Sequence, residues 1–221
     1  MIKRCASVHC VEPVSGFSTL CERHKRNQRR HGHAEQKGIT VQELKPFQDR
    51  ITARRIKNPE NPTWVLLRGR WTALTGHAKA TLAEYASGAV AVSYERQAAE
   101  QLVVLLDSVD GDAVIDTALA MFSMWELMPN RFQSDKAFNF QLSRRVRGLA
   151  DVNKGSHYSV KEGRMKRTYT DIPPRVLECL AASLKVAFGV AGMRLAELDK
   201  KDTEGVKVEK QQLNDALKDM S

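Results

Sequence analysis

Residues 1–33 contain three of the four cysteines in this 221-residue chain. Cys5 and Cys10 form one close pair, and Cys21 with His24 forms a second. A tetrahedral metal site is built from two such pairs joined by a turn, and Gly16 in the connecting loop lets the chain reverse. Three thiolates and one imidazole fill all four positions of a zinc ion. The pattern therefore predicts a structural zinc knuckle, which the metal holds together because so short a segment buries little apolar surface.

Two alternatives stay open from the sequence. In an oxidising compartment Cys5 and Cys10 would instead form a disulfide and leave Cys21 free. The fourth ligand has three other candidates, which are His9, His31 and His33. The chain opens with Met-Ile-Lys-Arg-Cys and lacks the apolar stretch of a signal peptide. Clustered cysteines in a protein that is not exported are more often metal ligands than cross-links, so we expect zinc and a cytoplasmic location.

Further residues around the ligands follow a pattern: Cys5, Val8, Cys10, Pro13, Val14, Leu20, Cys21, His24, Arg29, Arg30 and Gly32. In this pattern residues 1–33 resemble a small cysteine-rich module of many phage-encoded proteins, often found beside HNH endonucleases or DNA-binding domains. Lys25 and Arg26 depart from it, since the family often carries an aromatic residue after the histidine. The resemblance implies a phage or mobile-element origin and a function that involves nucleic acid. It implies no particular reaction.

Positive charge is concentrated in two parts of the chain, whose formal net charge is +9 and whose isoelectric point is about 9.5. Residues 1–60 carry 13 basic and 6 acidic side chains, and residues 131–170 carry 10 and 3. Residues 97–128, in contrast, carry six acidic side chains and no lysine or arginine. This distribution predicts two contacts with a polyanion, DNA above all. No run of 18 apolar residues occurs, so we expect no membrane partner.

A basic helix is predicted directly after His24. It contains Lys25, Arg26, Arg29 and Arg30, and Gly32 is expected to end it. Arginine pairs bidentately with phosphate or with the edge of a guanine, so this helix is the first candidate DNA contact.

Apolar periodicity predicts a mostly α-helical protein with one β-hairpin behind the knuckle. We divide it into a zinc-binding module (1–33), a basic helical linker (34–62) and a helical domain (63–221). Thr40 and Glu43 form a capping-box pattern, and Asn58-Pro-Glu-Asn-Pro62 marks the expected boundary. Helices are expected over 46–57, 64–85, 94–109, 113–128, 135–150, from 174 to about 198 and over 206–220, with two short strands at 156–160 and 165–170.

The order helix, helix, hairpin, helix within residues 112–190 resembles a winged helix-turn-helix domain. That resemblance implies that residues 134–150 are the recognition helix, with Arg144, Arg145 and Arg147 on it. It also implies a basic wing, formed by Lys161, Arg164, Lys166 and Arg167.

No catalytic motif is found, and the aspartates at 107, 110, 112 and 116 surround a helix start, where acidic residues are favoured. We therefore expect a DNA-binding protein and no enzyme, with double-stranded DNA favoured and a role in regulating transcription or replication. The alternative is an adaptor for host proteins such as RNA polymerase. A single-stranded DNA or RNA binder is the weaker alternative, since the sequence suggests few exposed aromatic side chains for stacking bases.

Overall fold

The computed structural model describes residues 3–90, 92–150, 153–160, 163–169 and 171–219, and for 153–157, 164, 166–169 and 205–219 it describes the backbone only. Within these ranges the chain is mostly helical. Its elements are α1 (Glu22–His31), α2 (Val41–Lys57), α3 (Pro62–Ala86), α4 (Ser93–Ser108), α5 (Gly111–Leu127), a 3-10 turn (Pro129–Arg131), α6 (Asp135–Arg147), β1 (Asn153–Ser159), β2 (Arg164–Tyr169) and α7 (Pro174–Asp219). β1 and β2 pair antiparallel, with Gly163 in the turn at φ +61°. The predicted mostly helical fold with one hairpin is confirmed.

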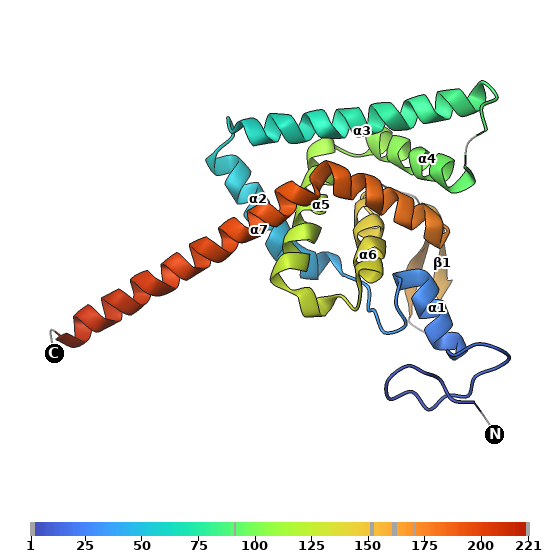
Figure 1. Ribbon diagram of the computed structural model, residues 1–221, viewed down its shortest axis with the longest axis horizontal. Coiled ribbons are helices and arrows are strands. Elements are labelled where there is room, and N and C mark those ends of the chain that lie inside the picture. The colour runs from blue at the N-terminus through green and yellow to red at the C-terminus, as the bar shows by residue number, and fades with distance from the viewer. Residues whose placement is uncertain (1–2, 91, 151–152, 161–162, 170, 220–221) are drawn as a thin grey trace.

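Helix α5 lies at the centre of the helical body (Figure 1). From Val114 to Met124 every residue except Asp116 is buried, because the sequence there is apolar or small on all sides. Helices α7 and α2 pack along it, and α6 and α3 cover further sides. One apolar core therefore runs from Ile39 to Phe188.

Helix α7 approaches α5 very closely through glycine. A Cβ atom added to Gly192 would lie 2.4 Å from the Cβ of Phe122, and the Ser123 hydroxyl donates a hydrogen bond to the Gly192 carbonyl at 3.3 Å. The two helices predicted at 174–198 and 206–220 are one continuous helix, whose second half extends away from the body (Figure 1). Pro174–Glu204 is long and apolar enough to span a membrane by length and composition alone, but half of its most apolar window is buried inside the protein, as in an ordinary core helix.

The segment expected to be a linker, residues 34–62, belongs to the core instead. The Thr40 capping box forms as predicted, and α2 continues from it through Pro46 without a break. Leu44, Phe47 and Ile51 on this helix are buried, and α2 packs against α5. This apolar contact outweighs the backbone hydrogen bond that Pro46 cannot donate. The break at Asn58–Pro62 is a turn within one body and does not separate two domains.

Two arginines, one on α2 and one on α3, form ion pairs with aspartates of α5. Arg55 pairs with Asp112 at 2.8 Å and with Asp116, and it stacks on the ring of Trp64. Arg68 from α3 also reaches Asp112, at 2.6 Å. Burial raises the pKa of Asp116 to about 6 in spite of the adjacent guanidinium. Asp112 and Asp116 of the acidic segment thus form ion pairs with arginines that, from the sequence alone, are expected to contribute to a basic surface.

The order of elements behind the winged helix-turn-helix resemblance is present, but α6 is buried. Seven of its 13 residues have no appreciable exposure, and α5, α7 and α1 contact it. Phe138, in the first turn of α6, stacks on Trp125 with ring centroids 4.5 Å apart and also contacts Phe122 and Phe132. A helix that enters a DNA groove needs an exposed face along its length, whereas α6 is exposed only at Asp135 and Lys136, at its start.

Candidate metal centre

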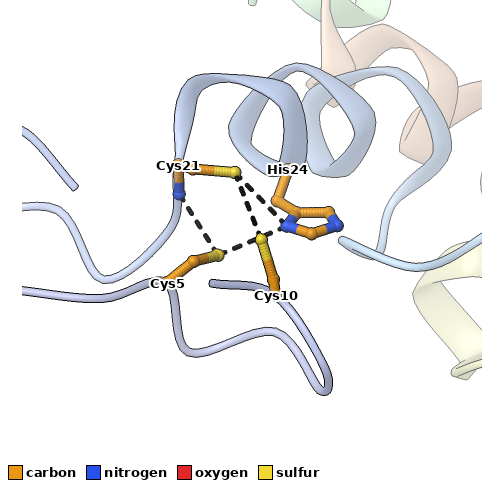
Figure 2. Close-up of side chains that lie close together, drawn as sticks. All are labelled: Cys5, Cys10, Cys21 and His24. Carbon is orange, nitrogen blue, oxygen red and sulfur yellow. Dashed lines mark hydrogen bonds between the residues drawn. The ribbon is translucent and has the colours of Figure 1, made fainter. Parts of the chain in front are cut away.

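The cysteine-rich segment is a small hairpin that leads into α1. The amide of Cys5 donates to the carbonyl of Glu12 at 3.1 Å, and the amide of Val14 donates to that of Lys3 at 2.9 Å. Cys5 and Cys10 come from this hairpin, whereas Cys21 is the N-cap residue of α1 and His24 lies in its first turn. Figure 2 shows the four side chains pointing toward one common centre.

The four ligand atoms all lie within 4.8 Å of one another. The sulfurs of Cys10 and Cys21 are 3.9 Å apart, and Nδ1 of His24 is 3.3 Å from the sulfur of Cys5 and 3.4 Å from that of Cys21. With metal–sulfur bonds of about 2.3 Å, a tetrahedral ion needs sulfurs about 3.8 Å apart. The group can therefore hold a metal ion, with Nδ1 as the nitrogen donor.

The structure shows neither of the alternatives that the sequence left open, a disulfide or a different histidine as the fourth ligand. All four cysteines are free thiols, so Cys5 and Cys10 are not joined by a disulfide. His9, His31 and His33 lie outside the ligand group. His31 instead contacts the side-chain amide of Gln141 on α6 at 3.0 Å, and its burial lowers its pKa to about 4.

A polar shell supports the ligands. Nε2 of His24 lies 3.3 Å from the hydroxyl of Ser7, which donates to the carboxylate of Glu35 at 2.8 Å. The same carboxylate accepts the backbone N–H of Val8 at 2.9 Å. With Nδ1 on a metal, Nε2 carries the proton and its N–H donates a hydrogen bond to the Ser7 hydroxyl oxygen, so this chain of hydrogen bonds fixes the tautomer and the ring orientation. Sequence reasoning missed Ser7 and Glu35, because no local pattern connects two polar residues 28 positions apart.

Burial and hydrogen bonding act in opposite directions on the Cys5 thiol. Desolvation disfavours the thiolate, but the backbone N–H groups of Cys21 and Ser7 and the ring of His24 together outweigh it. The pKa of Cys5 falls to about 6. The protein thus favours the metal-binding form of this ligand.

We predict that Ser7→Ala weakens metal binding by about 10- to 100-fold without changing the ligand set, because the His24 ring loses its hydrogen-bond acceptor. Competition with a chromophoric chelator measures the affinity. The control is Ser15→Ala, since Ser15 is exposed in the same module. Equal affinities of the two variants would show that Ser7 does not support the ligand.

The module is fastened to the helical body by its C-terminal end. Asn27 on α1 donates to the carbonyls of Ala34 at 2.6 Å and of Gln36 at 3.0 Å. Gly32 ends α1 at φ +82°, and a Cβ there would lie 2.7 Å from the Lys136 carbonyl on α6. The end of α1 therefore abuts the start of α6, with no room for a larger residue.

The predicted nucleic-acid residues of α1 are available on its surface. Arg26, Arg29 and Arg30 are exposed, and so is Arg23, which was not predicted. Lys25 is partly buried and pairs with Glu22 at 2.7 Å. Within the part of the chain that the structure describes, none of these four arginines pairs with a carboxylate, and Arg23 donates to the sulfur of Cys10 at 3.9 Å.

The arginines predicted on the recognition helix are partly buried, and two of them have partners within the protein. Arg144 pairs with Asp171 at 3.1 Å, and Arg147 donates to the side chain of Gln101 at 2.6 Å. Burial lowers the pKa of Arg145. Of the predicted wing, Lys161 lies outside the described residues, and Arg164, Lys166 and Arg167 lie on β2, where only the backbone is described.

Comparison with known proteins gives no relative: no family model, curated protein or solved structure matches this chain.

Proposed function

We propose that the Cys5–Cys10–Cys21–His24 centre binds zinc in a structural role. Three thiolates and one imidazole at tetrahedral spacing favour zinc over harder divalent ions, which prefer oxygen ligands. All four positions are filled by the protein, which leaves none for a substrate. The ion would stabilise the hairpin and the first turn of α1, and so set the direction of that helix.

We further propose that the protein binds DNA through α1. The observation that carries this proposal is the row of exposed arginines at 23, 26, 29 and 30, without an ion pair to any described carboxylate. Several arginines of the helical body are paired, as Arg54 is with Asp199 at 2.7 Å and Arg131 with Glu43 at 2.9 Å. Exposed arginines gathered on one short, anchored helix suit a row of phosphates.

The dimensions of α1 fit this role. Its ten residues span about 15 Å, a length over which duplex DNA carries roughly nine phosphate charges. The hairpin β1–β2 supplies a second basic segment by sequence, and the arginines of α6 contribute less because internal contacts hold them. The resemblance of residues 1–33 to phage modules supports a role in regulating transcription or replication of a phage or mobile element.

A salt titration of binding to duplex DNA tests the proposal. For wild type we expect affinity to fall steeply with salt, and for Arg26→Ala/Arg30→Ala we expect weaker binding with a log–log slope about 2 units shallower. Arg96→Ala removes a positive charge on α4, where Arg96 pairs with Glu100, and serves as the control. An unchanged slope in the α1 variant, or an equal change in the control, would refute the role of α1.

The second candidate is an adaptor for a host protein such as RNA polymerase. It is favoured by a row of exposed apolar side chains on α7, formed by Val186, Val190 and Met193. Capture of the same partner from untreated and nuclease-treated lysate would support this candidate, because a partner bridged by DNA is lost on treatment.

A further inference from the structure

The metal-bearing module exposes apolar side chains that its function in holding zinc does not explain. Phe17 has a relative exposure of 103%, and Val11 and Val8 have 75% and 67%. Single exposed valines are ordinary on protein surfaces. A phenylalanine in full contact with water is less so, and no other aromatic side chain in the described ranges is as exposed: Tyr158 reaches 58% and Tyr85 43%.

The loop that carries Phe17 is held at both ends. The backbone N–H of Val14 donates a hydrogen bond to the carbonyl of Lys3, and the backbone N–H of Ala6 donates one to the carbonyl of Thr19 at 2.8 Å. The hydroxyl of Ser18 accepts the amide of Leu20 at 3.1 Å, one residue before the ligand Cys21. Gly16 turns the chain at φ +65°, and a Cβ there would meet no atom within 4 Å. The ring therefore stands on an anchored loop in open space.

The loop that carries the ring leads directly into α1. Phe17 and Cys21 are four residues apart, which limits their separation to about 14 Å, and α1 itself extends about 15 Å further. Sites for single strands commonly cover 4–16 nucleotides, so one short strand can contact both the ring and the helix. The loops before α1 and α1 itself lie at one end of the molecule, beside the helical body (Figure 1).

We infer that Phe17 stacks on an unpaired nucleobase while the arginines of α1 hold the neighbouring phosphates. The preferred ligand is then DNA with an accessible base, such as a duplex that ends in a single-stranded extension. This inference rests on the proposed binding of DNA through α1. An exposed aromatic ring on the loop that leads into α1, together with the exposed arginines of that helix, matches the two components of a single strand, its bases and its phosphates. An apolar protein surface would match only Phe17 and the two valines.

The experiment compares a blunt duplex with the same duplex carrying a single-stranded extension, using the zinc-loaded full chain and fluorescence anisotropy. We expect wild type to prefer the extended duplex by roughly 5- to 150-fold, the effect of one stacked base. Phe17→Ala and Phe17→Leu abolish this preference and keep the affinity for the blunt duplex, whereas Phe17→Trp retains it. Equal zinc content in all variants shows that the module is intact.

The possible outcomes distinguish a failure of base stacking by Phe17 from a failure of DNA binding through α1. Binding that requires Arg26 and Arg30, but does not distinguish the two ligands or respond to Phe17→Ala, overturns the inference and leaves DNA binding in place. Retention of the preference by Phe17→Leu also overturns it, because leucine is apolar but cannot stack. Absence of binding to either DNA overturns both proposals.

Discussion

Replacing Cys21 with serine, or removing the metal with a chelator, should unfold the zinc-binding module, α1 included, and leave the helical body intact. In residues 3–31 the buried side chains are the ligands Cys5, Cys21 and His24, together with Ser7. The module has no other core in this described range. A structural zinc ion contributes about 10–16 kcal/mol of apparent binding free energy to such modules at neutral pH, and nothing here replaces it. The apolar core of the body begins at Ile39 and does not depend on the metal.

Limited trypsin digestion with and without chelator measures this effect. We expect new cleavage at the arginines and lysines between positions 3 and 31 and little change at the basic residues of the body. Cys179→Ser is the matched control, since Cys179 lies on α7 outside the ligand group. It should keep the full metal content and the wild-type digestion pattern. Resistance of the module to trypsin after complete metal removal would contradict the prediction.

Phe138→Ala should be the most damaging single change in the body. Phe138 is fully buried, and its ring contacts three other aromatic rings, two from α5 and that of Phe132 just after the 3-10 turn. Truncating such a residue costs about 3–5 kcal/mol, because a cavity remains where the ring was. This is a large part of the roughly 5–15 kcal/mol that usually separates folded from unfolded protein.

Chemical denaturation of the zinc-loaded protein provides the measurement. Phe17→Ala is the control, because it makes the same change at an exposed position and should alter the free energy of unfolding by less than about 0.5 kcal/mol. A loss below about 1 kcal/mol for Phe138→Ala would mean that the core closes over the cavity.

The elements of the fold could largely be predicted from the sequence, because apolar periodicity and caps are local signals. Thr40 and Glu43 form the expected capping box, and the pairing of Cys5–Cys10 with Cys21–His24 follows from spacing alone. The polar shell could not be predicted, because Glu35 meets Ser7 only after the hairpin and the end of α1 are in place.

The burial of α6 and the position of α2 were missed for a different reason. An arginine in a sequence looks exposed, but its long apolar stem lets it lie partly buried while its guanidinium finds a partner, as Arg147 does with Gln101. Likewise, the two prolines near residue 60 predict a turn correctly, yet they carry no information about whether both sides of the turn share one core.

The continuity of α7 has a mechanical consequence. Its last described ties to the body are the ion pairs of Asp199, Lys200 and Asp202, and the helix continues to Asp219. The stretch beyond Asp202 reaches about 25 Å past the body as a stiff rod. Each residue inserted into that stretch would turn everything beyond it by about 100° and advance it by about 1.5 Å. The rod thus fixes both the distance and the direction in which its far end is presented.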